Sequence, residues 1–468
     1  MKKIFLILFM IFQINIVNSQ VWSSVGTGLN GYGRIESMCE YNGDLYVGGY
    51  FDSIGGVQAF SIAKWNGTTW DSVPNSYFLT NYTNPWNPNL EIFDMVVYNG
   101  ELVVAGSTWV NGSQQRNIAK WNGTTWSQLG TGMDNRIFAI EVYNGELYAT
   151  GHFGQAGGVL ARGIARWNGT NWNQVGGPGL NLSPGFTGSA LEVNNGELYL
   201  AGGFYLINGL PVQSIAKWNG TVWDSVGSID ASISFQSLGS YNNKIYAGGY
   251  MNINSNPSNN WISSWNSTTW DSVGLGLNYI PGIMAEYNNE LYVAGQFDTA
   301  GGTQALCIAR WNELQWNTVG SGLNLFHINV DSAITPWDTT IVEKEFIYSM
   351  YTYDNELYVG GKFTQIGGIN ANSIAKWHIA GVSVDELNNE VDFSLYPTPF
   401  SKVVYLYSKQ NLENAQIIIH DLLGQEVRKL NKLFGQHFEI DRENLISGIY
   451  FLSLTSNGKT WTEKLMVE

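Results

Sequence analysis

The stretch Ile118-Ala119-Lys120-Trp121-Asn122-Gly123-Thr124-Thr125-Trp126 decides the fold, because versions of it recur along most of the 468-residue chain. Asn122-Gly123 suits the positive φ angles of a type I′ turn, so we predict a β-hairpin over residues 118–126. Repetition is therefore the strongest signal in the chain. The first tryptophan of the motif occurs seven times, at Trp65, Trp121, Trp167, Trp218, Trp265, Trp311 and Trp377.

A second motif, Tyr41-Asn42-Gly43-Asp44-Leu45-Tyr46, also occurs seven times and predicts a second hairpin in each unit. Four short antiparallel strands per unit are typical of a propeller blade. The pattern I-A-x-W-N-G-T-x-W followed by V-G resembles kelch-like and cell-polarity-marker repeats over about three quarters of the chain. That resemblance implies a propeller but no chemistry.

The two ends of the repeat region are offset from each other. The fourth-strand motif Trp22-Ser23-Ser24-Val25 precedes any first strand, whereas the seventh unit stops at Trp377-His378 without a fourth strand. An N-terminal strand that completes the last blade would remove both exposed edges. We predict an all-β chain, with a seven-bladed β-propeller over residues 20–378 closed by its N-terminal strand. An open β-solenoid would leave the offset unexplained.

Composition limits the classes of function. Only 13% of the residues are charged, whereas 44% are hydrophobic, which excludes global disorder. The formal net charge of the chain is −15, and residues 21–390 alone carry −16, which argues against nucleic-acid binding. Cys39 and Cys307 are too few for a disulfide framework, so we expect buried free thiols.

The N-terminus predicts a signal peptide in residues 1–19. Lys2 and Lys3 precede an uncharged run over residues 4–17, and small residues before Gln20 suit cleavage. The run is too short for a bilayer, which needs about 20 residues. We expect no membrane span after signal cleavage.

The repeat positions are first interpreted as scaffold. Fourteen of the 19 tryptophans occupy two repeat positions. A recurring acid, such as Glu146, either belongs to a ring of cation ligands or pairs with a recurring base, such as Arg166, on the next strand. In the fifth unit Lys244 replaces the acid and Ser264 replaces the base, and this joint change favours ion pairing.

Two enlarged connections, residues 75–91 and 323–345, are predicted to lie on one face of the ring. Aromatic side chains beside carboxylates suit sugars or apolar ligands. The alternative is that each loop packs its aromatic side chains into a small core of its own. The candidate binding residues on this face are Tyr82, Trp86, Trp109, His327, Trp337 and Asp338.

The sequence has no motif for catalysis or metal binding. His152, His327 and His378 stand in different units without metal-ligand spacing, and no nucleophile-elbow motif occurs. We predict no catalytic residue, no metal site and no cofactor. Catalysis by carboxylates alone stays open.

The repeat ends before residue 392, where alternating runs separated by turns predict a small β-sandwich over residues 392–468. The segment carries, in order, Y-P-x-P at residues 396–399, D-x-x-G-x-x-V at 421–427, L-x-x-G-x-Y at 445–450 and K-x-x-V at 464–467. This order resembles the type A C-terminal sorting domain of the Bacteroidetes type IX secretion system, with Thr398 where that family usually has Asn. The resemblance implies recognition by the type IX secretion machinery and removal of the tail within a linker at residues 379–391.

These observations predict a secreted, extracellular or outer-membrane-surface protein that binds or adheres, and whose propeller recognises glycans or a surface protein. The alternative is a secreted polysaccharide hydrolase or lyase that uses carboxylates at the loop-rich face. A third hypothesis is a purely structural envelope module. A close carboxylate pair at the channel mouth would favour the enzyme, and an uninterrupted aromatic platform would favour binding.

Overall fold

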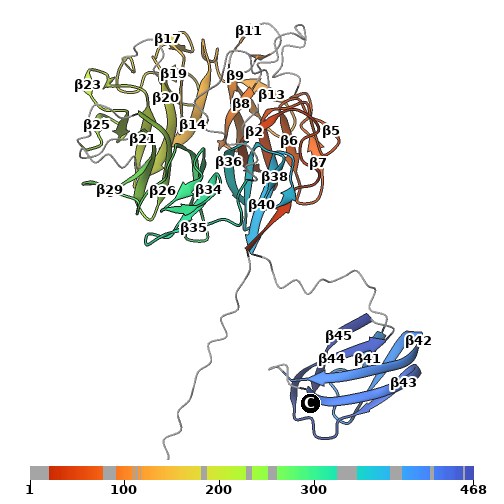
Figure 1. Cartoon of the computed structure of the whole chain (residues 1–468). Helices are drawn as coiled ribbons and strands as arrows, with labels where there is room; N and C mark the ends of the chain where they lie inside the picture. The colour runs from red at the N-terminus through yellow and green to blue at the C-terminus, as the bar shows by residue number, and fades with distance from the viewer. Residues whose placement is uncertain are drawn as a thin grey trace, which may run out of the picture. The chain divides into compact units, whose positions relative to one another are not determined.

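The computed structural model describes residues 20–76, 91–107, 109–110, 114–115, 117–180, 187–227, 234–250, 261–323, 345–379, 393–421, 426–456 and 459–468. Every regular element named in these ranges is a β-strand. The chain divides into two compact units, residues 1–381 and 382–468 (Figure 1).

The described residues of the first unit form seven four-stranded antiparallel sheets, consistent with propeller blades. We number these sheets in chain order. Sheet 1 contains β2 (Arg34–Tyr41), β3 (Asp44–Tyr50), β6 (Ile62–Trp65) and β7 (Trp70–Ser72). Sheet 2 contains β8 (Glu91–Tyr98), β9 (Glu101–Ser107), β12 (Ile118–Trp121) and β13 (Trp126–Gln128). Sheet 3 contains β14 (Ile137–Tyr143), β15 (Glu146–Gly151), β18 (Ile164–Trp167) and β19 (Trp172–Asn173).

The remaining sheets repeat this order. Sheet 4 contains β20 (Gly188–Asn194), β21 (Glu197–Gly202), β24 (Ile215–Trp218) and β25 (Trp223–Ser225). Sheet 5 contains β26 (Ser234–Tyr241), β27 (Lys244–Tyr250), β28 (Ile262–Trp265) and β29 (Trp270–Ser272). Sheet 6 contains β30 (Pro281–Tyr287), β31 (Glu290–Gly295), β34 (Ile308–Trp311) and β35 (Trp316–Thr318). Sheet 7 contains β36 (Phe346–Tyr353), β37 (Glu356–Lys362), β40 (Ile374–Ile379) and β1 (Gln20–Ser24).

Short two-stranded hairpins occupy described connections between second and third strands. They are β4 (Ser53–Ile54) with β5 (Val57–Gln58), β10 (Trp109–Val110) with β11 (Gln114–Gln115), β16 (Gln155–Ala156) with β17 (Val159–Leu160), β22 (Leu206–Ile207) with β23 (Leu210–Pro211), β32 (Thr299–Ala300) with β33 (Thr303–Gln304), and β38 (Gln365–Ile366) with β39 (Ile369–Asn370).

The turn chemistry matches the predicted hairpins. Between β14 and β15, Asn144 has φ 49° and Gly145 has φ 76°, so both residues adopt the left-handed conformation that a type I′ turn requires. Asparagine tolerates this conformation better than most residues, and glycine has no Cβ to oppose it.

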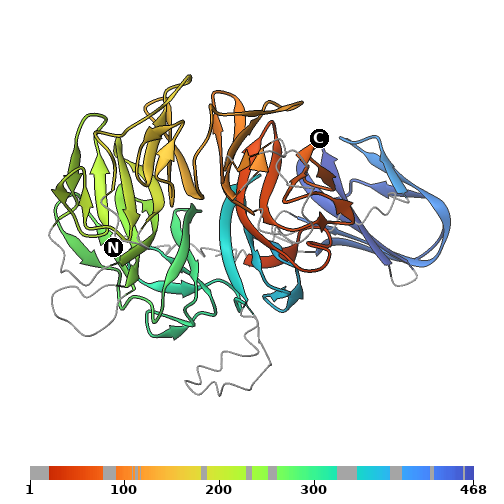
Figure 2. The ribbon, with the colours of Figure 1, turned by 90° about the horizontal axis from the view of Figure 1, so that it is seen from above.

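The N-terminal strand completes sheet 7, as the offset of the motifs predicts. β1 pairs antiparallel with β40, with Gln20 opposite Ile379 and Trp22 opposite Trp377. The first strands of the seven sheets contact one another in a closed cycle, from β2 through β8, β14, β20, β26, β30 and β36 back to β2. Figure 2 shows the sheets from above.

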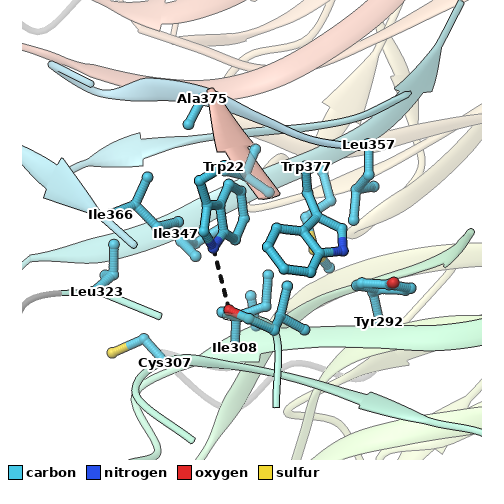
Figure 3. Close-up of a cluster of buried hydrophobic side chains, with 14 of the residues drawn as sticks. Trp22, Tyr292, Cys307, Ile308, Leu323, Ile347, Leu357, Ile366, Ala375 and Trp377 are labelled. Atoms are coloured by element: carbon cyan, nitrogen blue, oxygen red, sulfur yellow. Dashed lines mark hydrogen bonds between the residues drawn. The ribbon is translucent and has the colours of Figure 1, made fainter. Parts of the chain in front are cut away.

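One hydrogen bond repeats around this cycle. The indole Nε1–H of Trp22 donates to the backbone carbonyl of Val319 in the preceding sheet, over 3.2 Å (Figure 3). The same bond, from a fourth-strand tryptophan to the carbonyl just after the preceding fourth strand, occurs in all seven sheets. The other six run from Trp70 to Val25, Trp126 to Pro74, Trp172 to Leu129, Trp223 to Val175, Trp270 to Val226 and Trp316 to Val273.

The tryptophans also form the core between the sheets. The rings of Trp22 and Trp377 lie 5.0 Å apart between centroids, in a buried cluster with Ile347 and Leu357 (Figure 3). Each buried indole removes roughly 150–250 Å² from water. The repeated tryptophans therefore hold neighbouring sheets together.

The recurring acids and bases form ion pairs, as predicted from the fifth unit. Lys120 Nζ lies 2.5 Å from Glu101 Oε2, and Arg166 Nη1 lies 2.7 Å from Glu146 Oε2. Equivalent pairs are Lys64–Asp44, Lys217–Glu197, Arg310–Glu290 and Lys376–Glu356. In sheet 5 Lys244 reaches across to Glu313 in the turn of sheet 6, 2.7 Å away.

Cys39 and Cys307 are free and buried, as predicted. Burial raises the pKa of each thiol to about 12. Both side chains therefore stay protonated and act as small apolar residues.

The second unit is a five-stranded antiparallel sheet with β41 (Phe393–Tyr396), β42 (Val403–His420), β43 (Glu426–Asp441), β44 (Gly448–Ser456) and β45 (Lys459–Val467). The first half of β42 pairs with β41 and β43, and its second half pairs with β43 and β44. Leu406, Ile417 and Leu452 lie in its buried core. The two-sheet sandwich stays a prediction, because the pairing gives one connected sheet.

Candidate functional site

The connections into each first strand share one face of the first unit with the hairpins between second and third strands. We name this the loop face. Isolated bridges join the two kinds of segment: Leu29 with Ile54, Met133 with Ala156, Leu180 with Ile207, Leu277 with Ala300 and Leu323 with Ile366. The first strands begin and the second strands end at this face.

The predicted binding residues fall almost wholly outside the described residues. This holds for Tyr82, Trp86, His327, Trp337 and Asp338. Trp109 begins β10 and pairs with Gln115, but its side chain is not described. The arrangement of these six side chains therefore lies outside what the structure describes, and their role stays a prediction.

The seven first strands line a central channel of about 1190 Å³. Each first strand has a register irregularity near its start, where one residue is left out of the pairing with the second strand. Such bulges redirect a side chain and are common beside functional sites. Here the unpaired residue lines the channel near the loop face. These bulge residues are Glu36, Phe93, Phe138, Ser189, Gln236, Gly282 and Tyr348.

Aromatic rings form a continuous row on one side of this channel mouth. The rings of Phe93 and Phe138 lie 5.7 Å apart between centroids, and Phe138 lies 5.5 Å from His152. Both phenylalanines are half-buried and His152 is exposed. Tyr348, the bulge residue of sheet 7, is 37% exposed. The mouth thus offers ring faces that a ligand can reach.

A carboxyl pair lies beside this row. Arg34 forms ion pairs with Glu36 of its own strand and with Glu91 of β8. Both carboxyls therefore lie at the same guanidinium. Burial, and then the neighbouring Glu91, raise the pKa of Glu36 to about 8, although Arg34 opposes the shift. The pKa of Glu36 is thereby shifted into the neutral range.

Four further acids, Glu40, Asp94, Glu141 and Glu192, line the channel interior. Asp94 accepts hydrogen bonds from the backbone N–H of Met95 and of Ile140, each over 2.8 Å, and so ties sheet 2 to sheet 3. Its role is structural, although burial raises its pKa to about 6. Burial and the nearby Glu192 raise the pKa of Glu141 to about 8, and burial raises that of Glu192.

The channel mouth has both features that distinguish the hypotheses drawn from the sequence: aromatic rings, which favour binding, and paired carboxyls, which favour an enzyme. Two carboxyls that act on a glycosidic bond flank it about 5 Å or more apart, whereas Glu36 and Glu91 are both paired with the guanidinium of Arg34. Their engagement by Arg34 disfavours their use as acid and base on one bond. The aromatic row, by contrast, is continuous from Phe93 to His152.

Within the described ranges, no three His, Cys, Asp or Glu side chains gather as a group able to hold a metal ion. Over the same ranges, no helix is long and apolar enough to cross a membrane.

Sequence reasoning missed the bulge residues because they vary where the rest of the repeat is constant. A signal was present: each lies five residues before the residue that ends the first strand, as Phe138 does before Tyr143. Aligning the seven first strands at that end would have identified the position.

Residues 394–468 match the family described as the secretion system C-terminal sorting domain. The match supports a type IX secretion signal, as the order of motifs predicts. It implies interaction with the type IX secretion machinery and export out of the cell, to the surface or into the medium.

Two solved structures from Bacteroides thetaiotaomicron are similar over most of the chain. The extracellular domain of BT3049, assigned to the hybrid two-component systems, is 8% identical, with coverage of 96% of this chain and 72% of that chain and a TM-score of 0.33. A protein of unknown function from strain VPI-5482 is 9% identical, with coverage of 77% and 76% and a TM-score of 0.37. At these TM-scores neither likeness carries an argument. No curated protein matches the chain.

Proposed function

We propose that residues 20–378 form one seven-bladed β-propeller closed by β1, and that this propeller binds a glycan at the loop-face mouth of its channel. The signal peptide at residues 1–19 and the sorting domain at residues 392–468 serve export. The linker at residues 379–391 contains the site where the tail is removed.

The aromatic row at the mouth carries this proposal. Sugar rings present apolar C–H faces that stack on aromatic side chains, and their hydroxyls hydrogen-bond to carboxyls. Phe93, Phe138 and His152 supply the ring faces. Glu36 and Glu91 supply carboxyl oxygens, and Glu36, whose pKa burial raises to about 8, also supplies an O–H donor while it is protonated.

The predicted loop residues extend the same site. The described chain resumes at Glu91 and Glu345 after the two enlarged connections. Glu91 joins the carboxyl pair at the mouth, and Glu345 lines a neighbouring hollow of about 600 Å³ with Tyr32 and Lys362. We therefore expect Trp86 and Trp337 to contribute further stacking surfaces to a bound glycan.

A glycan panel tests the proposal. The full chain is screened as wild type, as Phe138→Ala and as the control Leu314→Ala, which truncates an 86% exposed side chain in a turn between third and fourth strands. We expect wild type and Leu314→Ala to bind the same glycans. Phe138→Ala should bind them at least about tenfold more weakly, a loss of about 1.4 kcal/mol.

Two outcomes would contradict glycan binding at the mouth: no bound glycan, or equal affinity of Phe138→Ala and wild type. Release of shorter oligosaccharides from a bound polysaccharide would support the hydrolase or lyase alternative instead.

A further inference from the structure

The geometry points to end-on recognition: we propose that the channel takes the end of a neutral oligosaccharide chain, which enters along the channel axis past the bulge residues. This inference rests on the proposed glycan binding and specifies which part of the glycan is bound.

The mouth is asymmetric. Sheets 1, 2, 3 and 7 place large side chains at the bulge, namely Glu36, Phe93, Phe138 and Tyr348. Sheets 4 and 6 place the small residues Ser189 and Gly282 there, and sheet 5 between them places Gln236. A Cβ added at Gly282 would have the carbonyl oxygen of Ala294, 3.8 Å away, as its nearest neighbour. The mouth is therefore more open at Ser189 and Gly282 than at the aromatic row.

The channel continues inward from this opening. Glu141 lies three residues beyond the bulge residue Phe138 on β14, and Glu192 lies three residues beyond Ser189 on β20. At about 3.3 Å per residue, these carboxyls are roughly 10 Å deeper than the rim. The volume of about 1190 Å³ exceeds the roughly 300–1,000 Å³ of typical ligand pockets. The interior therefore has both room and polar groups for a ligand.

The strands around the channel restrict which part of a glycan can reach the carboxyls of Glu141 and Glu192. First strands enclose the channel on all sides, so a ligand can enter it only along the axis. A polysaccharide that crosses the mouth touches the rim residues but not Glu141. A chain end or a terminal branch can stack on Phe138 and also extend inward.

The channel disfavours added negative charge. Burial and neighbouring carboxyls already raise the pKa of Glu36 and of Glu141, and the guanidinium of Arg34 is already paired with two carboxyls. An anionic sugar would meet the same unfavourable surroundings without a free cation from Arg34 to balance its charge. A neutral, hydroxyl-rich chain end meets hydrogen-bonding carboxyls without adding a negative charge.

A bulky side chain introduced at the channel mouth tests end-on recognition. Gly282→Phe places a ring in the more open side of the mouth, at a position where a Cβ meets no close neighbour. Leu314→Phe adds the same ring at an exposed turn as the control. We expect Gly282→Phe to weaken binding of linear neutral oligosaccharides at least tenfold, and Leu314→Phe to leave it unchanged. Cyclic oligosaccharides of the same sugar, which have no ends, should not bind wild type.

The outcomes separate the two proposals. If Phe138→Ala loses binding while Gly282→Phe keeps it, or if the cyclic ligand binds as well as the linear one, glycan binding stands and end-on entry is wrong. If wild type binds no oligosaccharide, glycan binding itself fails. Thermal unfolding checks that each variant folds. Gln236→Phe, at the exposed bulge of sheet 5, replaces Gly282→Phe if that variant does not fold.

Discussion

Two sets of seven equivalent residues in the first unit differ in how much the residue type varies from sheet to sheet. The fourth-strand tryptophans are identical in every sheet and make the same hydrogen bond to the preceding sheet. The bulge residues occupy an equally regular position, yet they include an acid, three aromatic residues, two small residues and a glutamine. Positions that hold the ring together are constant, whereas positions that face the channel are free to specialise.

The largest expected effect concerns the constant set. Trp22→Ala removes the indole that joins β1 to sheets 6 and 7, and truncation of a buried tryptophan costs about 3–5 kcal/mol. Trp70→Ala, in the contiguous sheet 1, removes the equivalent bond to Val25 and is the matched control. Chemical denaturation should show similar losses for both variants. A Trp22→Ala protein as stable as wild type would mean that β1 does not close the ring.

The next prediction concerns Glu141, a channel-lining residue three positions beyond the bulge residue of sheet 3, which we expect not to be optimised for stability. The pKa of Glu141 rises from 4.5 to about 8 on folding, so the native state holds more protons than the unfolded state between these values. The contribution of Glu141 to the free energy of unfolding is complete below pH 4.5 and is lost as the pH rises towards 8. Glu141→Gln cannot ionise and should abolish this loss.

Thermal unfolding at pH 5 and pH 8.5 measures the effect. We expect Glu141→Gln to match wild type at pH 5 and to be more stable at pH 8.5, by on the order of 1 kcal/mol or about 2 °C. Glu313→Gln is the control with opposite sign, because Lys244 lowers the pKa of Glu313. Equal pH profiles for Glu141→Gln and wild type would show that Glu141 is solvated in the channel.

The smallest effect concerns the ion pairs, which are constant in six sheets and rearranged in sheet 5. Their side chains are partly exposed, so Lys120→Met should cost no more than about 1 kcal/mol, and less in high salt. Lys244→Met should cost a similar amount, although its partner lies in the next sheet. Denaturant titrations in low and high salt measure both costs. A larger loss of stability for Lys244→Met than for Lys120→Met would mean that the Lys244–Glu313 pair specifically stabilises the contact between sheets 5 and 6.

Much of the scaffold could be predicted from the sequence because it repeats. Asn144-Gly145 specifies a tight turn locally, and the misplaced Trp22 motif indicates that the N-terminus completes the last sheet. The joint change at Lys244 and Ser264 correctly indicates that the recurring acids pair with bases.

The partner of Lys244 could not be predicted, because Glu313 lies in a turn of the next sheet, 69 residues away. The channel mouth could not be predicted for a related reason. Phe93, Phe138 and Tyr348 are ordinary strand residues in sequence and gather only when seven strands converge. The sequence instead favours loop residues such as Trp86 and Trp337, which lie outside the described residues.

Hydrogen–deuterium exchange with and without a bound oligosaccharide tests most directly whether the bulge residues carry binding. A ligand at the mouth should slow exchange in peptides that cover residues 91–98 and 137–143, which contain the bulges of sheets 2 and 3. Peptides from the outer strands β19 and β25 should exchange at an unchanged rate. Slower exchange confined to outer strands, with the first strands unaffected by a bound ligand, would contradict a binding site in the channel.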